Sequence, residues 1–126
     1  MHSFRIRVLI DVVALCRLSA GAPVPSWALS SPLFSITRTA EELSIVCRTE
    51  NVPDGVQSEG PLRVLQLEGP IPFSLTGVLA AILNPLAERG ISIFAVSTFD
   101  TDYILVRSND VDVAVSALRA AGHQIV

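Results

Sequence analysis

The stretch PFSLTGVLAAILNPLAERGISIFAVSTFDTDYILV, residues 72–106, carries a helix pattern followed by two strand patterns, and it decides the fold. Apolar residues recur at spacings of one and three and would form one buried stripe: Val78, Leu79, Ile82, Leu83 and Leu86. We expect Ser74 or Thr76 to cap the start of this helix, and Gly90 fits the left-handed position just past its end. The sequence therefore predicts an amphipathic helix between these signals.

Two runs of β-branched and aromatic residues follow the helix. ISIFAVSTF begins at Ile91 and YILVRS begins at Tyr103, and an Asp-Thr-Asp segment lies between them. Such runs on either side of a short polar segment indicate a hairpin or neighbouring antiparallel strands. Inside the preceding helix, Pro85 removes the hydrogen bond to the carbonyl of Ala81 and should bend the last turn.

The flanking segments complete a β-α-β-β-α-β order over residues 62–126. LRVLQLEG at 62–69 alternates apolar and polar residues as a strand does, and HQIV at the end of the chain is a second strand candidate. Between them, Asn109 and Asp112 indicate a capping-box-like helix start, and Gly122 indicates its end. The apolar stripe of this helix would be Val111, Ala114, Val115 and Leu118. We predict an α+β, ferredoxin-like fold, a four-stranded antiparallel sheet with both helices on one face.

The first half of the chain contains a sequence pattern similar to one in the second half. FSITRTAEELSIV, starting at Phe34, aligns with FAVSTFDTDYILV, starting at Phe94, at an offset of sixty residues that pairs Glu42 with Asp102. We interpret this as an internal repeat whose first copy is incomplete, because PVPSWALS has room for only about two helical turns. The predicted organisation is a truncated unit at 1–50, a Pro/Gly/acid linker at 51–61 and a complete unit at 62–126.

Composition and charge exclude several classes of protein. The formal net charge is −3, whereas nucleic acids and anionic membranes both require a basic face on their partner. Cys16 and Cys47 each lie in an apolar stretch, which is typical of reduced, buried thiols in a cytoplasmic protein. Arg5 and Arg7 before an apolar run outline a secretory signal, but Asp11 interrupts the run, so we expect a buried strand there.

The sequence offers little for catalysis. It contains no phosphate loop, nucleophile elbow, Cys-x-x-Cys or His-Cys-acid set, and Asp100 and Asp102 have no defined acid–base geometry. His2 and His123 do not form a metal site. We therefore expect no enzyme activity, no metal and no cofactor.

Residues 72–106 resemble an ACT domain, the small ligand-binding module of amino-acid-regulated proteins, in which a glycine opens the first helix, here Gly77. FSITRTAEELSIVC (34–47) and STFDTDYILV (97–106) resemble more closely the bacterial tandem ACT proteins related to the cytosolic arginine sensors of animals. The resemblance covers residues 12–126 and implies regulation by an amino acid bound between ACT units. Since the animal sensors carry four such units and this chain about two, it also implies a homodimer.

The resemblance implies a set of ligand-binding residues. They are Ser35 and Ile36 in the first unit, and Ser74, Leu75, Thr76, Gly77, Thr98, Phe99 and Asp102 in the second. Backbone N–H groups that follow Thr76 would suit the α-carboxylate of the ligand, and Asp102 would suit a cation. Gly77 would let the ligand approach the backbone.

Structural interpretations stay open beside these roles. Asp100 is expected to form an Asx-type turn, and for Asp102 the turn and the site are both open. The alternative functions are a ligand-free protein–protein association module and a regulatory subunit of an amino-acid metabolic enzyme.

Overall fold

The computed structural model describes residues 3–126, which form an α+β protein with two compact units. Unit 1 comprises the described residues up to Ile10 together with Arg63–Val126, and unit 2 comprises Asp11–Leu62. Two long strands, β1 (Arg5–Leu18) and β4 (Gln57–Leu67), contribute residues to both units. The division at residues 50 and 62 stays a prediction, although the end of the predicted linker already belongs to β4.

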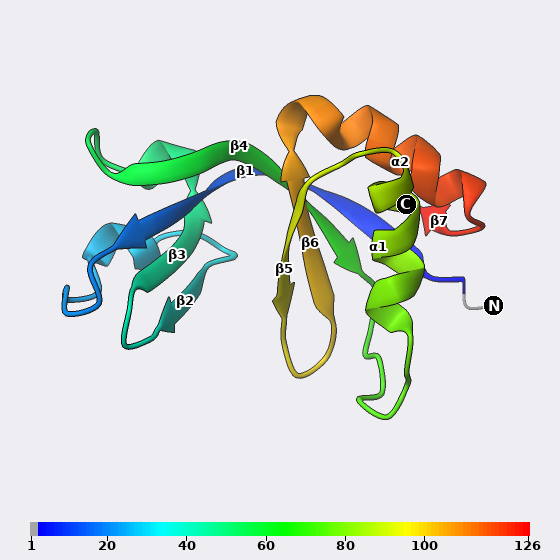
Figure 1. Cartoon of the computed structure of the whole chain (residues 1–126), viewed down its shortest axis with the longest axis horizontal. Helices are drawn as coiled ribbons and strands as arrows, with labels where there is room; N and C mark the ends of the chain where they lie inside the picture. The colour runs from blue at the N-terminus through cyan, green and yellow to red at the C-terminus, as the bar shows by residue number, and fades with distance from the viewer. Residues whose placement is uncertain (1–2) are drawn as a thin grey trace. The chain divides into compact units, whose positions relative to one another are not determined.

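The sheet of unit 1 has the strand order β7-β1-β4-β6-β5. It includes β5 (Ile93–Ser97), β6 (Asp102–Arg107) and the short β7 (Gln124–Ile125). β5 and β6 pair antiparallel with Ser97 opposite Asp102, so the predicted hairpin is confirmed (Figure 1).

The predicted four-strand arrangement of residues 62–126 is wrong in one respect, because β1 lies between β4 and β7. β7 pairs with β1 in parallel, with Arg5 opposite Gln124 and Ile6 opposite Ile125. The reason is the alternation at the start of the chain. Ile6 is fully buried in the core of unit 1, and Phe4 and Val8 pack against the same core. Residues that the resemblance left without a role therefore supply a strand.

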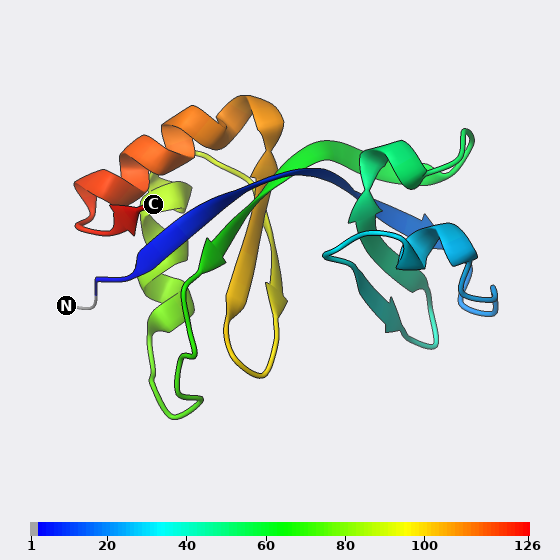
Figure 2. The ribbon, with the colours of Figure 1, turned by 180° about the vertical axis from the view of Figure 1, so that it is seen from behind.

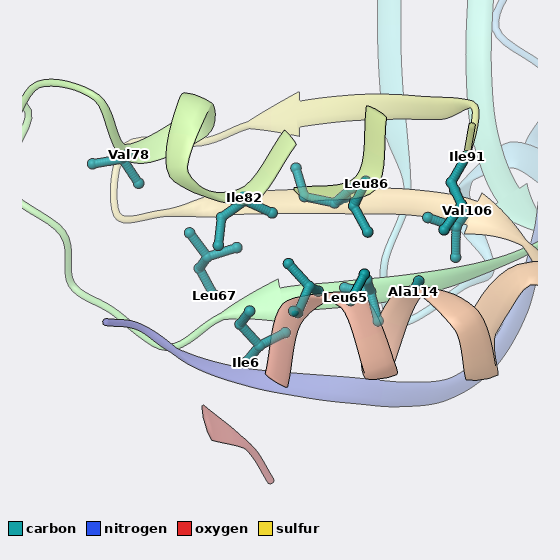
Figure 3. Packing of buried hydrophobic residues seen from close by; sticks show 12 residues of the cluster. Ile6, Leu65, Leu67, Val78, Ile82, Leu86, Ile91, Val106 and Ala114 are labelled. Atoms are coloured by element: carbon teal, nitrogen blue, oxygen red, sulfur yellow. The ribbon is translucent and has the colours of Figure 1, made fainter. Parts of the chain in front are cut away.

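Both helices of unit 1 cover the same face of its sheet (Figures 1 and 2). They are α1 (Val78–Glu88) and α2 (Val111–Ala120). Ile82 and Leu86 of α1 and Ala114 of α2 pack against Ile6 and Leu65 of the strands (Figure 3). The predicted apolar stripes are confirmed, since all their members lie in this core or, partly buried, against it, except Val115, which is half-buried.

The predicted ends of the helices are confirmed, but the predicted caps are wrong. Gly90 and Gly122 have φ of 69° and 96°, the left-handed conformation that glycine adopts without strain. Neither helix start has a side-chain cap hydrogen bond. Gly77 occupies the N-cap of α1, and the short helix η3 (Ser108–Asp110) leads directly into α2, so Ser74, Thr76 and Asn109 are not in capping positions.

Unit 2 contains the hairpin of β2 (Ser35–Arg38) and β3 (Leu43–Arg48), and β3 also pairs with β1. This confirms the strand expected near the start of the chain. The expected two-turn helix is the four-residue 3-10 helix η1 (Ser26–Leu29), and a second one, η2 (Thr49–Asn51), follows β3. The hydrophobic core of unit 2 is small and contains both cysteine thiols. Its buried residues are Ala14, Cys16, Ala28, Leu43, Ile45 and Cys47.

The two hairpins have the same four-residue turn. The spacing of these turns differs by one residue from the predicted offset of sixty between the two halves of the chain. Thr39 N–H donates to Glu42 O at 2.9 Å, and Thr98 N–H donates to Thr101 O at 2.8 Å. In each turn the threonine hydroxyl accepts the N–H of the last turn residue, at 3.1 Å and 3.3 Å. The turns are thus related by 59 residues, the difference between 39 and 98. Glu42 corresponds to Thr101, and the counterpart of Asp102 is the buried Leu43.

Candidate functional site

The loop between β4 and α1 is fastened to the turn between β5 and β6, and both views show them side by side (Figures 1 and 2). Ile71 N–H donates to Asp100 O at 2.7 Å, and the hydroxyl of Thr101 donates to Leu67 O at 2.7 Å. A Cβ at Gly69 would lie 2.9 Å from Asp100 O, so only glycine allows this close approach. The two segments are therefore held in a fixed relation.

An open pocket of about 320 Å³ lies where these segments meet the start of α1, entirely within unit 1. The loop lines it with Ile71, Pro72, Phe73, Leu75 and Gly77, the helix with Val78 and Leu79, and the hairpin with Ser97, Phe99, Thr101 and Asp102. This volume is near the lower end of the range of about 300–1,000 Å³ that is usual for small-molecule sites. The pocket combines an apolar wall with few polar groups, as such sites do.

Asp102 is the charged residue among the described residues that line the pocket. One carboxylate oxygen, Oδ1, accepts a hydrogen bond from the Ser97 hydroxyl at 2.5 Å across the hairpin. Within residues 3–126 the other oxygen has no hydrogen-bond partner, which leaves it able to accept from a ligand. Asp102 is thus oriented by its neighbour and still has an acceptor to offer.

The turn beside Asp102 is closed by threonine rather than by aspartate. The Thr98 hydroxyl donates to Thr101 O at 3.1 Å and accepts the N–H of Thr101. The expected Asx turn at Asp100 is wrong, because Asp100 contributes its backbone carbonyl to Ile71 while Thr98 makes the side-chain bonds. The turn therefore does not need the Asp102 side chain.

Gly77 gives α1 its start at the pocket. It adopts φ of 75°, and its carbonyl accepts the first helical bond, from Ala81 N–H at 3.0 Å. A side chain at this left-handed position would be strained. With no side chain capping this end, the N–H groups of the first turn and the positive end of the helix dipole are available to an anion.

The structure brings together four of the nine predicted site residues: Leu75, Gly77, Phe99 and Asp102. Ser74, Thr76 and Thr98 belong to the same two segments but do not line the pocket. Ser35 and Ile36 lie on β2 of unit 2, opposite Val46 and Ile45 of β3, and Ile36 packs against the core of that unit.

Sequence reasoning missed several lining residues, above all Phe73. The exposed fractions of Phe73 and Phe99 are 101% and 98%, so two aromatic rings at this pocket lie almost wholly in solvent. Burying a phenylalanine is worth about 1.5–3 kcal/mol, so the two exposed rings leave apolar surface that a bound molecule could cover. The signal in the sequence was a phenylalanine inside a proline-rich loop, where no core position was expected.

The described residues also bear on three other possible features: a metal cluster, a role for the two histidines and a membrane-spanning helix. Within residues 3–126 no group of three or more His, Cys, Asp or Glu side chains could hold a metal ion. His2 lies outside the described residues, and His123 is buried in unit 1. None of the helices described is both long and apolar enough to cross a bilayer.

Comparison with protein families gives two matches. The ACT domain model matches residues 57–120, and a model described as an N-terminal domain matches residues 11–55. Among curated proteins, the bovine (Bos taurus) cytosolic arginine sensor for mTORC1 subunit 1 is 29% identical over 96 residues. The match covers 68% of this chain and 29% of the sensor. A shorter match to the human sensor is 39% identical over 44 residues, 35% of this chain and 13% of the sensor.

Comparison with solved structures gives the same architecture. A protein from Agobacterium tumefaciens is 38% identical, with a TM-score of 0.94 and coverage of 100% of this chain and 94% of that one. A Vibrio cholerae protein described as of unknown function and possibly in transport has 23% identity, a TM-score of 0.77 and coverage of 94% and 90%. The regulatory subunit of aspartate kinase from Thermus flavus has 12% identity, a TM-score of 0.64 and coverage of 92% and 95%. The last two comparisons describe the fold alone.

Proposed function

Because the chain belongs to the ACT domain family, we propose that it is a non-catalytic regulatory protein that binds a free amino acid in the pocket between Gly77 and Asp102. The observation that carries the proposal is the pocket itself. It joins a carboxylate with an open acceptor, an uncapped helix start and an apolar wall within one fixed set of segments. An amino acid presents the complementary groups, an ammonium, a carboxylate and a side chain.

Each end of the ligand has a natural partner. The α-carboxylate would accept N–H groups from the first turn of α1, where the helix dipole favours an anion. The α-ammonium, or a basic side chain, would donate to Asp102, because a charge-assisted bond is stronger than a neutral one. Asp102 is the one charged residue among the described lining residues, so the side chain of the ligand need not carry a charge in addition to its α-ammonium and α-carboxylate.

The remaining assignments rest on the resemblance to the arginine sensors. Ser35, Ile36, Ser74, Thr76 and Thr98 are proposed to assist binding, with Thr98 acting through the turn it closes. Ser35→Ala tests the contribution of unit 2: it should weaken the ligand-induced stabilisation if Ser35 takes part and leave it unchanged if it does not.

The tandem and dimeric features belong to the same proposal. The equal turns at Thr39 and Thr98 support two related ACT-like units, the first truncated. Among the strands of unit 1, β5 is an edge strand, and its residues Ile93–Ser97 include no charge and no proline to prevent pairing with another strand. We propose a homodimer formed along this edge, which sedimentation analysis would detect. Cytoplasmic action fits the two free, buried thiols.

A thermal-shift screen of the protein against the twenty amino acids at millimolar concentration tests the function. A ligand at about a hundred times its dissociation constant adds about 2.7 kcal/mol, which moves the midpoint by several degrees. Asp102→Asn should abolish the shift of any hit. Asp100→Asn is the matched control, because Asp100 acts through its backbone, and should keep the shift.

The alternative of a ligand-free association module has one observation in its favour, the exposure of Phe73 and Phe99. A screen in which no amino acid stabilises a well-folded protein would favour this module, or a regulatory subunit of an amino-acid metabolic enzyme. Loss of a co-purifying protein in Phe73→Ser would then identify the docking surface.

A further inference from the structure

The apolar surface of the pocket in unit 1 is formed by side chains from all three of its segments. They include Ile71, Phe73 and Leu75 of the loop, Val78 and Leu79 of α1, and Phe99 of the β5–β6 turn. Val78 belongs to the core of unit 1, and Ile71, Leu75 and Leu79 pack against that core. Whichever segment the side chain of a ligand approaches, it therefore meets apolar surface.

Phe73 and Phe99 are the most exposed part of this surface. Ile71 N–H donates to Asp100 O at 2.7 Å, and this bond joins the loop to the turn close to both phenylalanines. The two rings thus come from segments that are fixed to each other, and both lie almost wholly in solvent. A side chain bound between the loop and the turn would remove apolar surface from water on the ligand and on the protein.

The two hydroxyl groups of the pocket have already used their protons. The Ser97 hydroxyl donates to Oδ1 of Asp102 at 2.5 Å, and the Thr101 hydroxyl donates to Leu67 O at 2.7 Å. A hydroxyl has one proton, so neither group can donate a second bond to a ligand. The carboxylate of Asp102 only accepts. The lining side chains that the structure describes therefore offer no donor to an amide or a carboxylate.

Charge restricts the ligand in the same direction. Asp102 is the single carboxylate of the described lining, and Lys, Arg and His are absent from that set. An acidic side chain would find no cation there and would lie near a like charge. A basic side chain would add a second cation to the α-ammonium, and one carboxylate oxygen with an open acceptor cannot pair fully with both.

We propose that the ligand of this pocket is an amino acid with an uncharged, apolar side chain, and that Phe73 and Phe99 determine this preference. The inference rests on the proposed function, in which Asp102 binds the α-ammonium. Because all amino acids share the α-ammonium and the α-carboxylate, the groups that bind these two ends cannot distinguish one amino acid from another. Selection depends on the residues that meet the side chain, and the lining presents apolar ones for that role.

Two matched pairs of amino acids test the preference in titration calorimetry with the full chain. Asparagine has the branching of leucine but an amide in place of the two methyl groups, and lysine has the stem of norleucine with an added ammonium. We expect leucine and norleucine to bind at least about tenfold more tightly than asparagine and lysine, because the amide and the ammonium lose water without gaining a partner. Binding of leucine should also lower the heat capacity.

Variants of the lining assign the preference to residues. Phe73→Ala and Phe99→Ala should each weaken the binding of leucine about tenfold and that of asparagine much less. Val113→Ala is the control, because Val113 is an exposed apolar residue of α2 outside the pocket, and it should leave both affinities unchanged. Asp102→Asn should weaken leucine and asparagine by the same factor, since it acts on the α-ammonium that they share.

The outcomes separate this inference from the function on which it rests. Equal affinities within both pairs, or tighter binding of asparagine or lysine, would overturn the apolar preference and leave a protein that binds amino acids. A preference for leucine that persisted in both alanine variants would remove the role of Phe73 and Phe99. If none of the four amino acids bound to the folded protein, the preference and the proposed function would both be wrong.

Discussion

The Thr101 hydroxyl donates a 2.7 Å hydrogen bond to the carbonyl of Leu67, and this contact joins the β5–β6 turn to the end of β4. Thr101 is 8% exposed, so the bond is shielded from water. It links two residues that lie 34 positions apart in the chain, and Thr101 itself lines the pocket. The position of Asp102, the next residue, depends on it.

Thr101→Val should destabilise the protein by about 1–3 kcal/mol, because it keeps the shape of the side chain but leaves a buried carbonyl without its donor. Urea unfolding measures the loss. Thr101→Ser retains the hydroxyl and is the matched control. Equal stability of the valine and serine variants would show that the bond contributes nothing.

Gly69→Ala should displace the loop that lines the pocket. Its Cβ would lie 2.9 Å from Asp100 O and 3.1 Å from Ile71 N, and both are backbone atoms that cannot move alone. Overpacking of this kind costs about 1–3 kcal/mol. Gly21→Ala is the control, since nothing lies within 4 Å of a Cβ there. If the two variants unfolded at the same urea concentration, the close approach at Gly69 would not constrain the loop.

The elements of unit 1 could be predicted from sequence, but the neighbour of β4 could not. The stripe from Val78 to Leu86 and the glycines at 90 and 122 are local signals, and the structure agrees with them. Alternation in residues 5–10 also predicts a strand. Which strand pairs with β4 depends on residues far apart in the sequence. In the structure the long β1 pairs with β4, and the two-residue β7 pairs with β1 instead.

The candidate site was predictable in part for a similar reason. The family pattern led to Gly77, Phe99 and Asp102, which the structure gathers at one pocket. Phe73 and Leu79 were missed, because their contribution depends on how the loop folds back onto the hairpin. The predicted alignment of the two halves pairs Phe34 with Phe94 at an offset of sixty residues, whereas the equivalent turns at Thr39 and Thr98 are 59 residues apart.

The two thiols of unit 2 should react slowly. Burial, followed by the neighbouring Cys47, raises the pKa of Cys16 to about 11, and burial raises the pKa of Cys47 as well. Because thiolate is the reactive form, a disulfide reagent at pH 8 should modify Cys16 in the folded protein about a hundredfold more slowly than in the urea-unfolded protein, and Cys47 more slowly as well. Comparable rates in the two states would show that the thiols are accessible.

The same thiols should make stability fall in alkali. Their raised pKa values mean that the folded state retains its thiol protons longer than the unfolded state does. The contribution is fully present below the unfolded value of about 9 and is lost as the pH rises toward 11. Cys16→Ala should flatten the decline between pH 9 and pH 11, which unfolding by urea at several pH values measures.

Glu68 should contribute to stability at neutral pH and lose that contribution in acid. Hydrogen bonds from Arg7 and then Arg5, both at 2.9 Å, lower the pKa of its carboxyl group. A lowered pKa gives stability above the unfolded value of 4.5 that disappears as the pH falls through the folded value. Glu68→Gln should therefore make the acid limb less steep, and added salt should reduce the difference, since the pairs are exposed. If the free energy of unfolding fell equally steeply in acid for the parent and Glu68→Gln, the ion pairs of Glu68 with Arg5 and Arg7 would not contribute to stability.

A double-mutant cycle between Pro85 and His123 should show that they compete for one carbonyl. His123→Ala leaves Ala81 O unpaired in the parent, and this should cost about 1–3 kcal/mol. Pro85→Ala restores an N–H at position 85, which can donate to Ala81 O within the helix. In that background His123→Ala should cost less, with a coupling of about 0.5 kcal/mol or more by urea unfolding. Additive effects would mean that the histidine does not replace the hydrogen bond that the proline removes.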